Sequence, residues 1–201
     1  MKVKFGPKIL LPTKYGDFDI THVEVNENGT LMREGVLLGK EPVDKEKIYV
    51  RVQSSCLFSE SFWTTDCDCS MQLQSAMEFI SQNGGYVLYF YEEGRGAGLK
   101  IKFQAIELQQ LHKYDTRKAY ECLNVNVDAR TFEASADVLK AVIGKQPIIL
   151  MTNNPGKVDG LVNNGIVVNE RMPLICGLDS DARKEYLAEK VKALGHIIEG
   201  L

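Results

Sequence analysis

Residues 86–98 read YVLYFYEEGRGAG, and this stretch indicates the class of the fold. The unbroken apolar run at its start predicts a short strand that is buried on both faces. The glycines that follow predict a turn into a helix, where backbone N–H groups can approach an anion. A glycine turn between a strand and a helix is equally often only a turn, so this segment alone does not establish a binding site.

The rest of the chain supplies further strands and helices around this segment. Alternating apolar residues and turn signals predict strands at 9–13, 17–25, 30–38, 47–55 and 147–151. Helical spacing of apolar residues predicts helices at 71–83, 99–111, 132–143, 158–165 and 181–194. The sequence therefore predicts one α+β domain over residues 1–201, with mixed and antiparallel sheets, packed helices, and ligands at the carboxyl ends of the buried strands.

Three cysteines lie close together as Cys56-x10-Cys67-Asp68-Cys69. Thiolates bind zinc tightly, and a catalytic zinc needs three protein ligands with a fourth position left for water. The spacing is not that of a standard zinc finger or ribbon, so a redox pair, a disulfide and apolar packing are alternatives. Cys122 and Cys176 have apolar neighbours and are expected to be buried packing residues. Metal-activated hydrolysis is the first hypothesis for function.

Two further polar segments are candidates for ligand binding. Residues 152–157, TNNPGK, follow a buried strand and offer Lys157 to a phosphate, although the same residues also form plain turns. Asp128 and Arg130 point the same way on an extended segment, and a solvent-exposed ion pair is the alternative interpretation. The histidines are scattered along the chain, and His196 is expected to pack or cap near its end.

Composition excludes several classes of function. The net charge is -3 and the pI is near 5.7, so binding to nucleic acid or to an anionic membrane is not expected. No apolar run approaches the roughly eighteen residues of a membrane span. Five cysteines at uneven spacing do not form a secreted disulfide framework. A cytoplasmic protein is therefore expected.

The motifs resemble, in order and over nearly the whole chain, those of GTP cyclohydrolase II, the zinc enzyme that opens riboflavin biosynthesis. They are LPTKYGDF, RVQSSC, CDCSMQLQ, EEGRGAGL, DARTF, LMTNNPGK and the closing NGIVVNERMPLICG and YLAEKVKALGH. The resemblance implies that GTP is hydrolysed at C8 of its imidazole ring, with release of formate and pyrophosphate. It also implies a zinc ion (Zn2+) on Cys56, Cys67 and Cys69, magnesium (Mg2+) on the phosphates, and a homodimer.

The same resemblance assigns roles to other residues. Asp128 corresponds to the proton acceptor, and Arg130 to the arginine that acts at the α-phosphate. Arginine suits that position because its charge is permanent and its donors are bidentate. The expected nucleotide-binding residues are Arg51, Val52, Gln53, Ser54, Ser55, Gln72, Glu93, Gly94, Arg95, Thr116, Thr152 and Lys157.

The sequence departs from the family at positions that bear on the product. Ile106 stands where the family has a catalytic tyrosine, and isoleucine neither donates a hydrogen bond nor ionises. Gln53, Ser55, Asp66 and Glu92 also replace the usual residues, and Asp66 takes the place of an arginine beside the metal segment, which disfavours a triphosphate. The product is therefore expected to be a diaminopyrimidine or a formamidopyrimidine ribosylamine 5′-phosphate. A cyclohydrolase for another purine nucleotide and a non-catalytic zinc- and nucleotide-binding paralogue are the alternatives.

Overall fold

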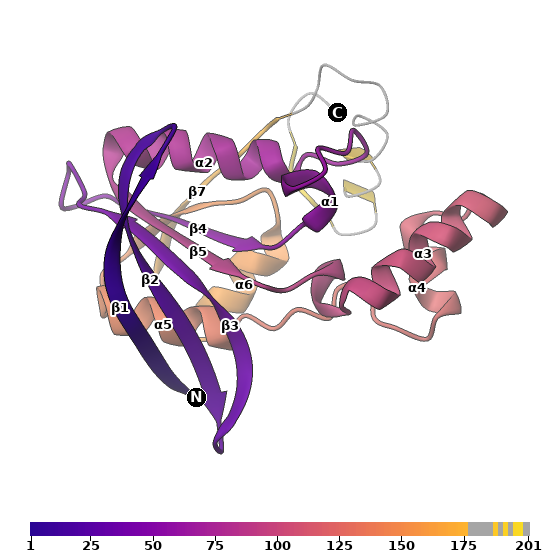
Figure 1. Ribbon diagram of the computed structural model, residues 1–201, viewed down its shortest axis with the longest axis horizontal. Helices are drawn as coiled ribbons and strands as arrows, with labels where there is room; N and C mark the ends of the chain where they lie inside the picture. Colours follow the sequence, from indigo (N-terminus) through magenta and orange to yellow (C-terminus); the bar gives the residue numbers. More distant parts are fainter. Residues whose placement is uncertain (177–186, 189–190, 193–194, 199–201) are drawn as a thin grey trace.

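The computed structural model describes residues 1–176, 187–188, 191–192 and 195–198. Within these residues seven strands form one sheet, in the order β1-β2-β3-β5-β4-β6-β7 (Figure 1). The strands are β1 (Lys2–Thr13), β2 (Gly16–Glu27), β3 (Thr30–Lys40), β4 (Ile48–Ser54), β5 (Gly85–Phe90), β6 (Ile148–Met151) and β7 (Val168–Met172). The helices are α1 (Leu57–Glu60), α2 (Cys69–Asn83), α3 (Leu99–His112), α4 (Thr116–Cys122), α5 (Glu133–Ile143) and α6 (Pro155–Asn163), with a 3-10 turn η1 (Gly94–Gly96).

The sheet is antiparallel on one side and parallel on the other. β1, β2, β3 and β5 pair antiparallel, whereas β4 pairs parallel with β5 and β6, and β6 with β7. Asn28 and Gly29 both have positive φ in the turn between β2 and β3, which is the geometry of a tight hairpin. The parallel strands are separated by helices, as a parallel crossover requires. The predicted α+β class with mixed and antiparallel pairing is confirmed, and both kinds of pairing occur in a single sheet.

Helices cover both faces of the parallel part of the sheet. α2 lies on one face, and α5 and α6 lie on the other (Figure 1). On β5, Val87 packs in the same apolar cluster as Ile80 of α2, while Leu88 packs in the opposite cluster with Leu139 of α5. All four side chains are fully buried, and each such burial stabilises the fold by about 1.5–3 kcal/mol. The prediction that this strand is buried on both faces is therefore confirmed.

Local sequence patterns located most of the other elements. The helices predicted at 71–83, 99–111, 132–143 and 158–165 correspond to α2, α3, α5 and α6. Three elements were not predicted, namely the single turn α1, the short helix α4 and the strand β7. The polar segment Val168–Met172 becomes a strand only because it pairs with β6. The helix predicted at 181–194 lies mostly outside the described residues.

The arm formed by α3 and α4 extends away from the sheet (Figure 1). Its two helices pack on each other through a small apolar cluster that contains Ala105, Ala119 and Tyr120. Cys122 is exposed, so the prediction that it is buried was wrong. The buried face of α4 carries Thr116, Ala119 and Tyr120, and position 122 lies on another face of the same helix. Cys176 is half-buried, 3.4 Å from the hydroxyl of Ser75.

The parallel pairing brings three loops to one edge of the sheet. β4, β5 and β6 are neighbours that run the same way, so the segments after residues 54, 90 and 151 leave the sheet at the same edge. These are the segments that contain Cys56, the EEGRGAG turn and TNNPGK. In the described part of the chain, the helices are all too short or too polar to cross a membrane.

Candidate active site

A cavity of about 720 Å³ opens at the edge where β4, β5 and β6 end. Its walls come from the loops after these strands, from the start of α2, and from the α3–α4 arm. The volume falls within the roughly 300–1,000 Å³ that small-molecule sites occupy. Among the lining residues, lysine and arginine outnumber aspartate and glutamate six to three. The cavity therefore suits a small anionic ligand.

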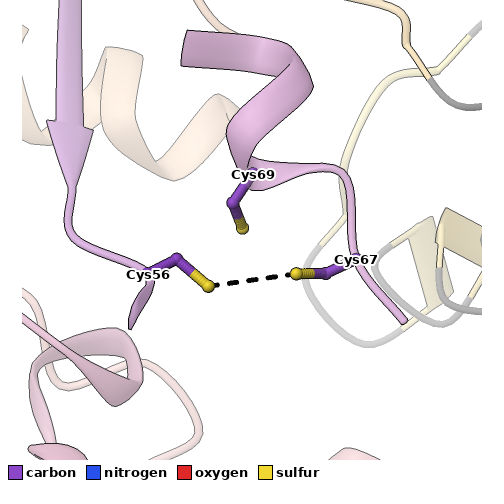
Figure 2. A group of neighbouring side chains, drawn as sticks. All are labelled: Cys56, Cys67 and Cys69. Carbon is purple, nitrogen blue, oxygen red and sulfur yellow. Dashed lines mark hydrogen bonds between the residues drawn. The ribbon is translucent and has the colours of Figure 1, made fainter. Parts of the chain in front are cut away.

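The three clustered cysteines line this cavity. Their sulfur atoms point toward one another (Figure 2). Their Sγ atoms all lie within 4.8 Å of one another, and those of Cys56 and Cys67 are 3.9 Å apart. Tetrahedral zinc with Zn–S bonds of about 2.3 Å needs sulfurs about 3.8 Å apart, so the donor set fits this metal. No disulfide joins the described cysteines. Among the described residues, no fourth Cys, His, Asp or Glu joins the group.

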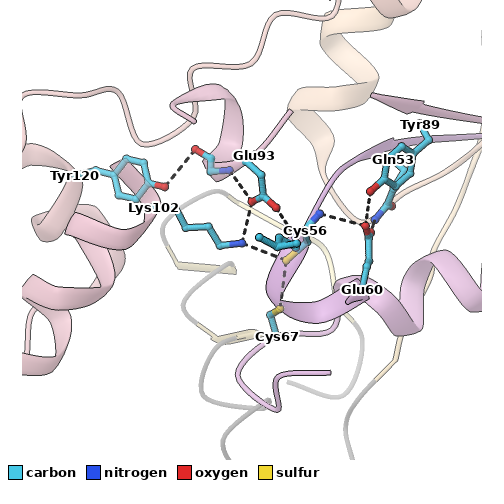
Figure 3. A network of polar contacts seen from close by, with 10 residues as sticks. Gln53, Cys56, Glu60, Cys67, Tyr89, Glu93, Lys102 and Tyr120 are labelled. Carbon is cyan, nitrogen blue, oxygen red and sulfur yellow. Dashed lines mark hydrogen bonds and ion pairs between the residues drawn. The ribbon is translucent and has the colours of Figure 1, made fainter. Parts of the chain in front are cut away.

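Carboxylates support the segment that carries Cys56 (Figure 3). Glu60 accepts hydrogen bonds from the backbone N–H of Cys56 at 3.2 Å, from the Tyr89 hydroxyl at 2.5 Å and from Gln53 Nε2 at 2.9 Å. Glu93 accepts a hydrogen bond from the backbone N–H of the next residue, Leu57. The backbone on either side of the Cys56 Cα atom is therefore held by a charged acceptor, which gives stronger hydrogen bonds than a neutral one.

Two buried basic side chains line the cavity without a carboxylate partner. Arg51 is only 5% exposed and donates to the side-chain oxygens of Gln53 and Gln72 and to the carbonyl of Met151. Burial lowers the pKa of Arg51 to about 10. Lys157 is equally buried and donates to a backbone carbonyl at 2.6 Å. Burial, followed by repulsion from Arg51 and Arg130, lowers the pKa of Lys157 well below its ordinary value. Neither side chain forms an ion pair with another described residue, so an anion bound in the cavity would favour the charged form of each.

Asp128 and Arg130 form an ion pair at the edge of the same cavity. Arg130 Nε donates to Asp128 Oδ1 at 2.8 Å, and Nη2 donates to Oδ2. Their side chains are 24% and 13% exposed, so the pair is not the solvent-exposed one considered from spacing. Burial raises the pKa of Asp128, but the hydrogen bonds and charge of Arg130 outweigh it and leave this pKa below its usual value. Asp128 is therefore a carboxylate at neutral pH.

The cavity brings together most of the residues that the resemblance implied. The three cysteines and Arg130 line it, together with Arg51, Gln53, Ser54, Ser55, Gln72, Glu93, Gly94, Arg95, Thr116, Thr152 and Lys157. Val52 and Asp128 are not among the lining residues. Val52 is buried and supplies the carbonyl that Lys157 binds, and Asp128 contributes through Arg130.

Sequence reasoning missed several lining residues. They include Lys102, Gln109, Gln110, Lys113, Tyr120 and His196. On α3, the lining positions recur every three or four residues and so form one face of the helix. This spacing in the sequence could have identified them. His196 was expected only to pack or cap, yet it also lines the cavity. No local signal marks it, because its position depends on where the chain returns after β7.

The positions that depart from the family also lie in the cavity wall. Ile106 lines it from α3, among the residues that face the loops of the sheet edge. Glu92 also lines it and pairs with Arg33 at 3.0 Å, so its added negative charge is offset locally. Gln53 accepts a hydrogen bond from Arg51 and donates one to Glu60. Asp66 is exposed and adds a negative charge. It forms no ion pair with another described residue, so this charge is not offset as that of Glu92 is.

Comparison with known proteins agrees with this geometry. Residues 6–173 match the profile of the family described as GTP cyclohydrolase II. The chain is 38% identical to GTP cyclohydrolase-2 of Blochmanniella floridana, with 98% of this chain and 97% of that protein covered. It is 36% identical to GTP cyclohydrolase-2 of Cronobacter sakazakii, with both chains fully covered. It is also 38% identical to the riboflavin biosynthesis protein RibBA of Bacillus velezensis, but there it spans only 47% of that protein. The chain belongs to the GTP cyclohydrolase II family.

Proposed function

We propose that this protein opens the imidazole ring of GTP by zinc-dependent hydrolysis at C8 and releases pyrophosphate from the triphosphate. The observation that carries the proposal is that three cysteine sulfurs and a set of buried cations line one cavity. Relatives named GTP cyclohydrolase-2 that align along nearly their whole length support the same reaction.

Cys56, Cys67 and Cys69 would hold the zinc ion. Once bound, zinc supplies Lewis-acid chemistry that makes a water molecule nucleophilic near neutral pH. Three ligands from the protein leave room for a fourth, as catalytic zinc sites require. The hydrogen bonds from the Cys56 and Leu57 N–H groups to Glu60 and Glu93 keep the first ligand in place.

The buried cations would bind the triphosphate. Arg51 and Arg130 lower the pKa of Lys157 by electrostatic repulsion, and Arg130 does the same to Arg51. The negative charge of a triphosphate would offset this repulsion. The Nη1 atom of Arg95 is also buried without a hydrogen-bond partner among the described residues. It is a further donor for a phosphate oxygen. Mg2+ would accompany the phosphates, because it prefers oxygen ligands and usually binds through substrate phosphates.

Asp128 and Arg130 would act together at the α-phosphate. Asp128 occupies one edge of the Arg130 guanidinium, which fixes the plane of that group and leaves the remaining donors for phosphate oxygens. The hydrogen bonds and charge of Arg130 lower the pKa of Asp128, so Asp128 is an ionised carboxylate, the form that the proton-acceptor role implied by the family requires. Because Asp128 does not line the cavity, its effect on the substrate would pass mainly through Arg130.

The product is proposed to keep its formyl group, as a formamidopyrimidine ribosylamine 5′-phosphate. Ile106 lines the cavity and has no hydroxyl to assist hydrolysis of the formamide. Loss of one acid–base group typically costs a factor on the order of 10² to 10⁴ in rate, enough to stop the reaction at the ring-opened stage. Tyr120 also lines the cavity, but its hydroxyl donates to the carbonyl of Gly94 at 3.2 Å.

The test is to incubate the zinc-loaded protein with GTP and Mg2+ and to identify products by mass spectrometry, with separate assays for formate and pyrophosphate. A ring-opened product that retains the formyl carbon supports the proposal, and Cys67→Ser should abolish it. Stoichiometric formate would refute the truncated product but keep the ring-opening activity. Unchanged GTP, with ring opening of another purine nucleotide instead, would overturn the choice of substrate. Unchanged nucleotides throughout would favour the non-catalytic alternative.

Two further properties of the family are proposed for this protein. Residues 1–201 would form a single catalytic domain, and two copies would form a homodimer. Light scattering coupled to size-exclusion chromatography tests the second directly, since the chain mass is 22.5 kDa. A monomer at micromolar concentration would refute it.

A further inference from the structure

Lys102 of α3 lies between the EEGRGAG turn and the cysteine cluster (Figure 3). Its Nζ atom is 2.9 Å from Glu93 Oε2 and donates to Cys56 Sγ at 3.4 Å. The ammonium also lies over the ring of Phe58, 4.5 Å from its centroid. Glu93, Cys56 and Phe58 thus hold the Lys102 ammonium in one position, and the Lys102 side chain is only 16% exposed.

Both carboxylate oxygens of Glu93 accept hydrogen bonds from the protein itself. One carboxylate oxygen accepts from the backbone of Leu57, and the other accepts from Lys102 and from the backbone of Gly94. Glu93 therefore has little capacity left for a substrate, although its position in the turn suggested nucleotide binding. Its contacts instead position Lys102 against Cys56.

The charge of the cysteine cluster explains what such a cation does. Three thiolates and one divalent ion carry one net negative charge, in a site where Cys56 is buried and the other two cysteines are half-buried. An excess negative charge is costly where water is excluded. A nearby cation offsets this charge, and its hydrogen bond to a ligand sulfur orients that ligand, as partners of metal ligands generally do. Lys102 places its ammonium within hydrogen-bond distance of one sulfur of the cluster, Cys56 Sγ.

We propose that Lys102 is a positioning residue of the metal centre, which offsets the net charge of the three-thiolate site and orients Cys56 Sγ. The inference rests on the proposed zinc-dependent function and adds to it a residue that no motif singled out. Because Glu93 belongs to the EEGRGAG turn, Lys102 also links the expected phosphate loop to the metal ligands.

The test compares zinc binding and cobalt spectra of four variants. Lys102→Met removes charge and donor, Lys102→Gln keeps a donor without charge, and Lys102→Arg keeps the charge. Lys100→Met is the matched control, because Lys100 is an exposed residue on the same helix and forms no ion pair with a described residue. Zinc affinity is measured by competition with a chromophoric chelator, and circular dichroism confirms that each variant is folded.

Zinc affinity should fall about 10- to 100-fold in Lys102→Met and Lys102→Gln, the usual effect of removing a partner of a metal ligand. Their Co²⁺ derivatives should show a shifted sulfur-to-metal charge-transfer band. Lys102→Arg should recover most of the affinity, and Lys100→Met should match the wild type. Wild-type affinity and an unchanged band in Lys102→Met or Lys102→Gln would overturn the inference while leaving the metal centre intact. A wild-type protein that binds no zinc would instead refute the proposed function itself.

Discussion

Replacement of Gly96 by alanine tests whether the EEGRGAG turn and the Arg130 segment position each other. Gly96 has a φ of +85°, and a Cβ atom there would lie 3.1 Å from Ala129 C and from Arg130 N. The two segments are also joined by a hydrogen bond of 3.0 Å from Ala129 N–H to the Arg95 carbonyl. Both contacts are with backbone atoms, so a methyl group would have to displace the Arg130 segment.

Gly29→Ala is the matched control for this change. Gly29 has a φ of +84°, and a Cβ atom there would meet nothing within 4 Å. The left-handed conformation alone should cost about 1 kcal/mol in either variant. Crowding should add roughly 2 kcal/mol to Gly96→Ala only. For a domain of this size each 1 kcal/mol lowers Tm by about 2–4 °C, so Gly96→Ala should melt roughly 4–8 °C below Gly29→Ala.

Activity should separate the two variants as well. A catalytic group displaced by 1 Å can lose about 10² in rate, and a shift of a few tenths of an ångström should therefore cost about tenfold. Pyrophosphate release from GTP should fall by this factor in Gly96→Ala and stay at the wild-type rate in Gly29→Ala. Thermal unfolding by circular dichroism and a coupled pyrophosphate assay measure both effects. Equal Tm values together with equal rates would refute the proposed coupling.

Four other changes have defined outcomes. Cys67→Ser should bring the zinc content measured by mass spectrometry close to zero, and a retained equivalent of zinc would contradict the ligand set. Ile106→Tyr should increase formate released per GTP opened by at least about tenfold, since it supplies the missing hydroxyl, and an unchanged ratio would argue against that role. Leu88→Ala should lower the free energy of unfolding by about 2–5 kcal/mol in urea titration, because Leu88 is fully buried between sheet and helices. Burial raises the pKa of Asp128 but Arg130 lowers it further, so its stabilising effect is present above the ordinary pKa of 3.8 and is lost as pH falls through the lower folded value. Asp128→Asn should therefore flatten the fall of Tm with acid below about pH 4, and an unchanged acid profile would contradict this assignment.

Local patterns in the sequence located the parts of the fold that depend on near neighbours. The apolar run before EEGRGAG became β5, with Val87 and Leu88 buried on opposite faces. Asn28 and Gly29 form the turn between β2 and β3, because residues that tolerate positive φ fit there. By contrast, nothing in the polar segment Val168–Met172 marks it as a strand, since its hydrogen bonds come from β6.

The order of strands was also outside the reach of local reasoning. β5 lies between β3 and β4, so the hairpin part and the parallel part share one sheet. Pairing of distant segments depends on which faces can be buried together, and a pattern within one segment does not contain that information. Cys122 shows the same limit, because its exposure follows from the face of α4 that packs on α3.

The sequence by itself determined which ligand atoms are available. Three cysteines in one segment are soft metal ligands whatever the fold around them, and the ordered motifs indicated the family that the comparisons then showed. Only the tertiary structure decided that Asp128 lies behind Arg130, that His196 reaches the cavity and that Lys102 lies against Cys56. The physical reason is the distance along the chain over which each property is set. Ligand chemistry belongs to the side chain itself, whereas burial, charge pairing and orientation are set by residues that are distant in sequence and are brought together by the fold.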